Sequence, residues 1–343
     1  MTSLERTRRM ISGDIVDHLP AQPMLMMFAA KNAGIKYIDY TRDPGLMAEA
    51  QLKVASDYGV DCLLTCSDPA REVIDIDGEG SVDWFTDQGP AINEARAVLG
   101  EKNRLASLKL PVPKAPGRMR ERIEAIRIMR REAGEGMSIV GWVEGPLALA
   151  QELRGLNNIM IDFLEDEPFT RDLLDFCAEV AVPYALEQIE AGADTIGMSD
   201  AAACMIGPEL YGSFVNPVQD RILRAIRAEH PGAIIRLHMC GRTDPLFPAM
   251  RLLPVDIYEI DFPANLREAH RAFGEERTIC GNVSTITDLL EGTPEQVYES
   301  CARCHASCGD RYIVGAGCEV SPATPPENLR AMIAYAREHD NRA

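Results

Sequence analysis

Positive charge is scarce in this chain of 343 residues. The sequence has 35 Lys and Arg residues against 53 Asp and Glu residues, which gives a formal net charge of −18 and an isoelectric point near 4.8. A protein without a basic surplus has little with which to displace the counterions of a phosphate backbone. Nucleic acids and anionic membrane surfaces are therefore poor partners.

Long apolar runs are also missing. The first 20 residues are charged throughout and lack the apolar centre of a signal peptide, and no later segment has enough consecutive apolar residues to span a bilayer. We therefore expect a cytoplasmic protein. In that compartment the ten cysteines should stay reduced, as buried side chains, metal ligands or reactive thiols rather than disulfides.

The composition is that of a folded globular protein, with 46% hydrophobic and 26% charged residues. Stretches with apolar residues three and four positions apart, which is the spacing of amphipathic helices, alternate with short β-rich apolar runs. Several of the helical stretches end in Gly just before the next run. The eight β-rich runs cover residues 24–28, 61–66, 138–145, 193–200, 233–240, 255–261, 278–284 and 311–318.

Eight strands alternating with helices predict a (β/α)8 TIM barrel, an α/β fold, as a single domain over residues 1–343. A doubly wound open sheet is the competing arrangement. The chief irregularity is the segment 67–115, in which turn signals separate short alternating runs. We expect this segment to form a hairpin insertion over the mouth of the barrel.

The fifth run ends in His238 and Cys240, which lie two residues apart and so point to the same side of a strand. Taken alone, such a pair is more simply explained by packing in a buried strand. However, Cys318 ends the eighth run, and the C-terminal ends of barrel strands meet at one face. Two thiols and one imidazole leave one position open, as a catalytic zinc requires, so we predict a Zn²⁺ site at these three residues.

Five segments carry a resemblance to a known family: LERTRRMISGDIVDHLP at 4–20, EAGAD at 190–194, LHMCG at 237–241, GNV at 281–283 and GAGCEVSPATPPENL at 315–329. They resemble the uroporphyrinogen decarboxylase superfamily, and within it the cobamide-dependent methyltransferase branch that includes methylcobamide:coenzyme M methyltransferases. His238, Cys240 and Cys318 match the zinc signature of that branch. The resemblance implies a zinc-dependent methyltransferase.

The chain departs from the true decarboxylases at one informative place. Those enzymes carry an arginine-containing segment after the first strand, which holds the carboxylates of the porphyrinogen, whereas residues 24–34 read MLMMFAAKNAG without an arginine. This departure and the zinc signature disfavour a lyase of heme synthesis. By the same resemblance, Asp68 matches the acidic residue that decarboxylases place near the pyrrole nitrogens. A helix N-cap is an equally good explanation for Asp68.

The predicted zinc site suits methyl transfer to sulfur. A free thiol has a pKa near ~8.5 and only the thiolate is a nucleophile, so coordination to Zn²⁺ would generate the reactive form at neutral pH. Two anionic Cys ligands would leave electron density on the substrate thiolate for attack on a methyl group. The resemblance implies that a methylcorrinoid, carried by a small corrinoid protein, is the co-substrate, and that Co(I) is released when the thiol acceptor is methylated.

Two other functions stay open. A demethylase component would use the same zinc in the opposite direction and pass a methyl group from an O- or S-methylated substrate to the corrinoid. A non-catalytic corrinoid- or tetrapyrrole-binding protein would have no use for the zinc site. The small-molecule acceptor is equally open, because coenzyme M, tetrahydrofolate, homocysteine and other thiols all fit the residues named so far.

Polar residues at other strand ends are candidates for the same site. Asp261 resembles, in its position at a strand end, a glutamate that binds zinc in cobalamin-independent methyltransferases. It is a possible fourth ligand, directly or through water, or a support of the ligands, or the cap of a turn. Four more residues are possible substrate or cofactor pocket groups and equally possible turn or cap residues: Glu144, Asp200, Asn282 and Glu319.

Residues 301–305 read CARCH, the pattern of covalent heme attachment. The segment lies in a predicted helix of a chain without an export signal, which that chemistry needs. We therefore interpret Cys301, Cys304 and Cys308 as one face of a helix. A second metal held by these cysteines and His305 is conceivable but crowded on a single helix.

Overall fold

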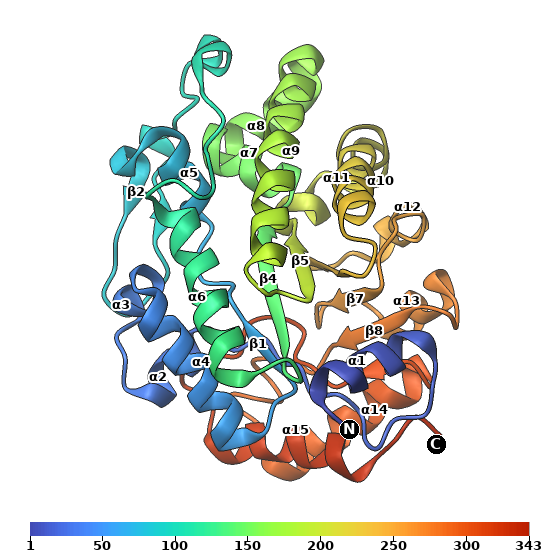
Figure 1. Cartoon of the computed structure of the whole chain (residues 1–343). Coiled ribbons are helices and arrows are strands. Elements are labelled where there is room, and N and C mark those ends of the chain that lie inside the picture. Colours follow the sequence, from blue (N-terminus) through green and yellow to red (C-terminus); the bar gives the residue numbers. More distant parts are fainter. Residues whose placement is uncertain (343) are drawn as a thin grey trace.

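A curled, parallel sheet of seven strands forms the centre of the protein, with the order β1-β4-β5-β6-β7-β8-β9 (Figure 1). The computed structural model describes residues 1–342. Neighbouring strands follow chain order, as in a TIM barrel, so the predicted α/β barrel fold is confirmed. The strands are β1 (Cys62–Leu64), β4 (Ser138–Glu144), β5 (Thr195–Ser199), β6 (Ile234–Met239), β7 (Ile257–Ile260), β8 (Thr278–Gly281) and β9 (Tyr312–Ile313).

Helices connect the strands and surround the sheet (Figure 1). The predicted amphipathic stretches form the long helices, several of which end at a Gly with positive φ, such as Gly59 and Gly134. None of the helices within residues 1–342 has both the length and the hydropathy to cross a bilayer. The helices are α1 (Ser3–Ser12), α2 (Met27–Ala33), α3 (Tyr37–Arg42), α4 (Pro44–Tyr58), α5 (Ala70–Asp77), α6 (Arg118–Ala133), α7 (Pro146–Arg154), α8 (Leu156–Glu165), α9 (Glu167–Glu190), α10 (Gly207–Leu210), α11 (Asn216–Glu229), α12 (Phe247–Met250), α13 (Leu266–Phe273), α14 (Pro294–Cys308) and α15 (Pro326–Glu338).

The first predicted strand, residues 24–28, is not a strand: α2 already begins at Met27. An extended segment just before it takes part in the sheet instead. The backbone N–H of Gln22 donates to Val314 on one side, and the carbonyl of Ala21 accepts from Asp61 on the other. A regular ladder cannot form here, because the flanking Pro20 and Pro23 have no backbone N–H.

The predicted insertion contains a hairpin, but a smaller one than the sequence indicated. Antiparallel strands β2 (Val82–Asp83) and β3 (Ala91–Ile92) form it. The preceding residues 70–77, expected to be part of the hairpin, form helix α5 instead. The first turn of this helix buries Arg71 and Glu72 among charged partners. Because hydrophobic periodicity detects buried apolar residues and not buried ion pairs, it did not indicate this helix.

Candidate functional site

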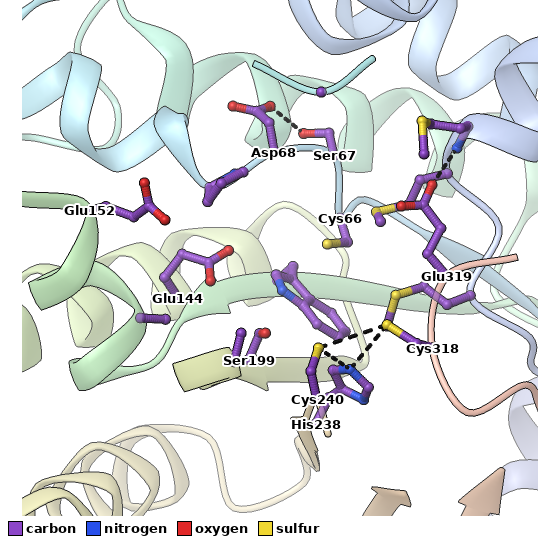
Figure 2. A pocket seen from close by; sticks show the side chains of 18 of the residues that line it. Cys66, Ser67, Asp68, Glu144, Glu152, Ser199, His238, Cys240, Cys318 and Glu319 are labelled. Carbon is purple, nitrogen blue, oxygen red and sulfur yellow. Dashed lines mark hydrogen bonds between the residues drawn. The ribbon is translucent and has the colours of Figure 1, made fainter. Parts of the chain in front are cut away.

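A cavity of about 300 Å³ opens where the parallel strands end (Figure 2). Its lining comes from strand ends, from α7 and, through Gly89, from the β2–β3 hairpin, which therefore reaches the mouth of the barrel as expected. The lining residues are Met24, Met26, Met27, Tyr37, Cys66, Ser67, Asp68, Pro69, Gly89, Trp142, Glu144, Ala148, Gln151, Glu152, Ser199, Ala201, His238, Cys240, Cys318 and Glu319.

His238, Cys240 and Cys318 meet on one wall of this cavity (Figure 2). His238 lies near the end of β6, Cys240 follows that strand directly, and Cys318 lies in the segment after β9. The Nε2 atom of His238 is 3.3 Å from Sγ of Cys240 and 3.8 Å from Sγ of Cys318. The two sulfur atoms are 3.8 Å apart. The fold therefore brings together the three side chains that the sequence proposed as ligands.

These distances can be compared with those in a zinc site. With bonds of about 2.3 Å to sulfur and about 2.05 Å to nitrogen, a tetrahedral zinc separates two sulfur ligands by about 3.8 Å and a nitrogen from a sulfur by about 3.6 Å. The observed triangle has edges of 3.3, 3.8 and 3.8 Å. Within residues 1–342, this is the one group of His, Cys, Asp or Glu side chains whose ligand atoms converge in this way. The residues thus fit a Cys₂His zinc site with one open position.

The two thiols are electrostatically unequal. A hydrogen bond from Cys240 lowers the pKa of Cys318 to about 4, and the neighbouring His238 adds to that effect. The same hydrogen bond, together with burial, raises the pKa of Cys240. Burial alone would lower the pKa of His238, but Cys318 and Glu259 outweigh it and raise that pKa. The sulfurs of Cys240 and Cys318 thus share one proton. A divalent cation readily displaces that proton, because it binds both cysteines as thiolates.

Glu259 is a site residue that the sequence did not reveal. It lies opposite His238 in the parallel β6–β7 ladder, and its Oε2 is 3.5 Å from Nδ1 of His238. The Nε of Arg236 donates to the same oxygen over 3.0 Å. Metal-ligating histidines are usually oriented by a carboxylate on the second ring nitrogen, and Glu259 stands in that place. The signal in the sequence was a charged pair, Arg236 and Glu259, inside otherwise apolar strands.

Asp261 supports the backbone around the cysteines rather than pointing at their sulfurs. Its Oδ2 accepts a hydrogen bond from the N–H of Gly241 over 2.6 Å, and its Oδ1 accepts from the N–H of Phe262 over 2.7 Å. Both carboxylate oxygens are therefore engaged in turns, one of which carries Cys240. Among the roles that the sequence left open for Asp261, this geometry favours the support of a ligand.

The remaining strand-end candidates divide into two groups. Glu144 and Glu319 line the cavity, and Oε1 of Glu319 accepts a hydrogen bond from the N–H of Met27. Asp200 lies behind the wall, where its carboxylate accepts from the N–H of Ala148 and from Gln219. The amide of Asn282 donates to the carbonyls of Asp261 and Ala264, away from the cavity.

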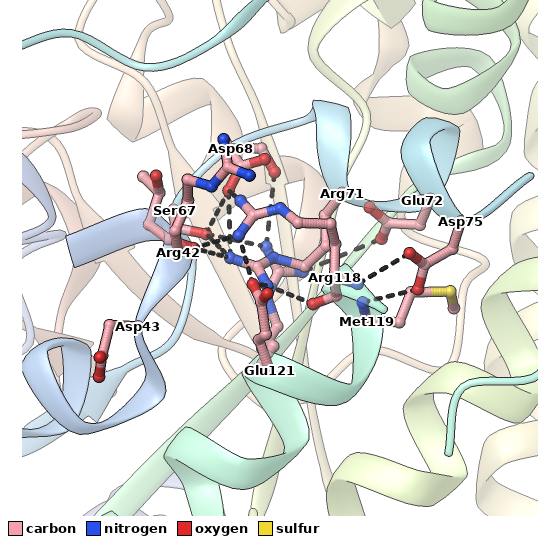
Figure 3. A network of polar contacts seen from close by, with 12 residues as sticks. Arg42, Asp43, Ser67, Asp68, Arg71, Glu72, Asp75, Arg118, Met119 and Glu121 are labelled. Carbon is pink, nitrogen blue, oxygen red and sulfur yellow. Dashed lines mark hydrogen bonds and ion pairs between the residues drawn. The ribbon is translucent and has the colours of Figure 1, made fainter. Parts of the chain in front are cut away.

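Asp68 lies at the edge of the cavity in a network of buried charges (Figure 3). Its Oδ2 accepts a hydrogen bond from Ser67 over 2.7 Å and is 3.2 Å from guanidinium nitrogens of both Arg71 and Arg118. Burial raises the pKa of a carboxyl group, but these arginines outweigh it and lower the pKa of Asp68. Among residues 1–342, no side chain caps the N-terminus of α5, so the ion pairs, rather than a capping role, explain Asp68.

The other residue that sequence reasoning missed is Glu152, which faces the cavity from α7 near Glu144 (Figure 2). A helix position is not marked by a strand end, and Glu152 is the only acidic residue of α7, as a single carboxylate on an exposed helix face would be. The packing of α7 against α5 and α9 places Glu152 at the cavity.

The cysteine-rich helix α14 is separate from this cavity. Cys301, Cys304 and Cys308 are all buried, and Cys304 lies 3.6 Å from the side-chain oxygen of Asn282. The Nδ1 atom of His305 is 3.0 Å from the hydroxyl of Tyr335. The three cysteines thus occupy the inner face of a helix, as expected from their spacing.

Known proteins resemble this chain in sequence and in fold. The family profile described as uroporphyrinogen decarboxylase (URO-D) matches residues 2–339. The chain is 31% identical over 226 residues to a methylcobamide:CoM methyltransferase, MtbA, of Methanosarcina acetivorans, and the match spans 65% of each protein. It is 27% identical to a methylated-thiol–coenzyme M methyltransferase of Methanosarcina mazei, over 98% of this chain and 90% of that one.

The fold is likewise that of a solved structure. A methyltransferase from Methanosarcina mazei superposes with a TM-score of 0.89, covering 98% of this chain and 99% of the other at 22% sequence identity. At this level of identity the likeness concerns the fold alone.

Proposed function

The chain belongs to the uroporphyrinogen decarboxylase family, and on that premise we propose that it is a zinc-dependent methyltransferase that moves a methyl group between a methylcorrinoid and a small thiol. The observation that carries this proposal is the convergence of His238, Cys240 and Cys318 on the cavity wall. The relatives whose names contain methylcobamide support a corrinoid as the other substrate.

The ligand set would serve sulfur chemistry. A zinc ion held by His238, Cys240 and Cys318 would lower the pKa of a substrate thiol, so that the reactive thiolate is present at neutral pH. The two cysteines, as anionic ligands, would offset the charge of the cation and leave the substrate sulfur nucleophilic. Glu259 would orient the ring of His238, since its Oε2 lies 3.5 Å from Nδ1, and Asp261 accepts a hydrogen bond from the turn that carries Cys240.

The rest of the cavity suits this reaction better than porphyrinogen decarboxylation. Within the described chain, no Lys or Arg is among the residues that line it, whereas four carboxyl side chains are: Asp68, Glu144, Glu152 and Glu319. The many carboxylates of a porphyrinogen would therefore find no Lys or Arg to bind them among the described lining residues. The apolar walls, which include Met24, Met26 and Trp142, would keep water from the reacting sulfur.

The methylcorrinoid is too large for a cavity of about 300 Å³, so it must present its methyl group at the mouth. We propose that a small corrinoid protein delivers it there, next to the β2–β3 hairpin that contributes Gly89. In this arrangement the thiol enters first and lies between the sulfur ligands and the opening.

The test is an assay of the zinc-loaded protein with free methylcobalamin and a panel of thiols, followed by the absorbance of Co(I) cobalamin. We expect thiol-dependent loss of methylcobalamin with the parent and with the surface control Glu299→Gln, and none with a Cys240→Ala, Cys318→Ala variant. Glu299 is exposed on α14. Inertness toward every thiol, with methylation of Co(I) cobalamin by a methoxy or methylthio compound, would instead establish the demethylase direction.

A further inference from the structure

The acidic end of the cavity indicates which kind of small molecule it accepts. We propose that the substrate carries a positive charge at the end away from its sulfur, and that Glu144 and Glu152 bind this charge. The inference rests on the proposed function, because it specifies the thiol or thioether that the same cavity would take.

Glu144 is a buried carboxyl group without a partner. It is the last residue of β4, exposes only 7% of its surface and points into the cavity (Figure 2). Within residues 1–342 it has neither a hydrogen-bond donor nor an ion-pair partner. Buried polar groups are almost always satisfied, so a carboxyl group left open toward a cavity indicates a ligand that satisfies it.

Two further carboxyl groups surround Glu144. Glu152 faces it from α7 and accepts a single hydrogen bond, from Gln151 over 3.3 Å. Glu72 lies behind the wall, and both of its oxygens are buried without a hydrogen-bond donor. The guanidinium of Arg122, 3.9 Å from Glu72, donates to the carbonyl of Trp142 instead. Within residues 1–342, this end of the cavity therefore has more carboxyl groups than Lys or Arg side chains that donate hydrogen bonds to them.

The nearby positive charges are already paired and do not line the cavity. Arg71 and Arg118 both bind Asp68, and both also contact Glu121 (Figure 3). An anionic group of the substrate would thus find no free Lys or Arg among the described lining residues. It would have to keep the neighbouring carboxyl groups protonated, whereas a cation would favour their ionised forms.

The two ends of the cavity are a short distance apart. Glu144 on β4 is level with Ser199 on β5, which is level with His238 on β6. Two strand spacings correspond to about 10 Å between the backbones, and the side chains on both sides shorten that gap. A molecule with a thiol and a cation separated by two or three carbon atoms can therefore reach both ends.

The ionisation of these groups supports the same assignment. Burial, reinforced by Glu72 and Glu152, raises the pKa of Glu144 well above its usual range. Burial likewise raises the pKa of Glu152 to about 7. A cation between the two would favour their ionised forms, whereas a sulfonate would have to bind to protonated acids only.

Three ethanethiols that differ only in the terminal group test this inference: 2-aminoethanethiol, 2-mercaptoethanol and 2-mercaptoethanesulfonate. Their binding is measured on protein loaded with Co²⁺ in place of zinc, through the sulfur-to-cobalt absorption and without any corrinoid. We expect the amine to bind at least about tenfold more tightly than the sulfonate. The thiols differ in intrinsic acidity, so the decisive quantity is the change of their affinity ratio between the parent and a Glu144→Gln, Glu152→Gln variant.

The double variant should lose most of the preference for the amine, while its metal content stays that of the parent. Glu299→Gln, which removes one exposed carboxylate on α14, should keep the preference. Tighter binding of the sulfonate to the parent, or an unchanged ratio in the double variant, would overturn the inference. Methylcobalamin turnover is measured separately. A protein that prefers the amine but does not turn over methylcobalamin would refute the proposed methyl transfer. A protein that turns over methylcobalamin but prefers the sulfonate would refute only the charge assignment.

Discussion

His238 on β6 and Glu259 on β7 lie opposite each other in the parallel sheet, with Nδ1 of the imidazole 3.5 Å from Oε2 of the carboxylate. Arg236, two residues before His238 on the same strand, donates to that carboxylate. The ring nitrogen that faces the two cysteines is Nε2, and Nδ1 lies beside the buried ion pair of Arg236 and Glu259.

The first prediction follows from this relationship. Glu259→Gln should weaken zinc binding by about 10- to 100-fold although all three ligands remain, because the imidazole loses its charged partner. It should also lower the free energy of unfolding by on the order of 3 kcal/mol, since Arg236 is left buried without a counter-charge. Zinc competition with a chelator and urea unfolding measure the two effects. Unchanged zinc affinity would show that Glu259 does not support the ligand.

The second prediction concerns the ligands themselves. A Cys240→Ala, Cys318→Ala variant should lose its zinc, while the parent holds about one zinc per chain. The variant should still fold, because the stability of this barrel comes from its apolar core rather than from the metal. Elemental analysis and circular dichroism decide the matter. Full zinc retention in the folded variant would place the metal elsewhere.

The third prediction concerns the cysteine-rich helix α14. Cys301→Ala and Cys304→Ala together should leave zinc content and methyl transfer within a few-fold of the parent, because these thiols are buried away from the cavity. A stability loss of about 1–2 kcal/mol is expected from the small cavities that remain. Loss of zinc from this variant, or a heme absorbance in the parent, would contradict our interpretation of the CARCH segment.

Much of this site could be predicted from the sequence, because the three proposed ligands lie at or shortly after strand ends and strand ends are marked by apolar runs. His238 and Cys240 lie two apart in such a run, so their common direction followed from the geometry of a strand. The first strand could not be predicted in the same way, since Pro20 and Pro23 interrupt the ladder that the apolar run at 24–28 suggested.

Most of the supporting contacts were not predictable, because they depend on how distant segments meet. The sequence offered Asp261 as a possible support of the ligands, but it did not indicate Gly241 as the partner of Asp261 or Glu259 as a second support. Glu259 faces His238 only through the register of β6 and β7, and Asp261 holds Gly241 across the same pair of strands. Glu152 reaches the cavity because of the way α7 packs against α5 and α9. Periodicity describes which face of an element is buried and carries no information about the partner that it meets.

The fourth prediction is a pH dependence of stability. The pKa of Glu152 is raised from 4.5 to about 7, so the folded protein binds more protons than the unfolded chain between these values, and its stability falls as the pH rises through this window. The full shift corresponds to at most about 3 kcal/mol, and partial exposure of the side chain reduces it. The groups that face Glu152 are Gln151, Glu72, Glu94, Asp68 and Glu144.

Glu152→Gln should remove this loss. The free energy of unfolding of the variant, minus that of the parent, should be higher at pH 8 than at pH 5 by about 1–2 kcal/mol, as measured by urea unfolding. Glu299→Gln, exposed on α14, should follow the parent at both pH values. If the free energies of unfolding of Glu152→Gln and the parent differ by the same amount at pH 5 and at pH 8, Glu152 has an ordinary pKa.

The most direct test of the central claim is the number of protons released when a thiol binds to the zinc-loaded protein. Calorimetric titration with 2-mercaptoethanol at pH 7, in buffers of different ionisation enthalpy, gives this number, and the neutral end of the molecule leaves the acidic end of the cavity undisturbed. Our account predicts release of about one proton per thiol in the parent, and none in metal-free protein or in the Cys240→Ala, Cys318→Ala variant. Binding of the thiol to the zinc-loaded parent without proton release would contradict it.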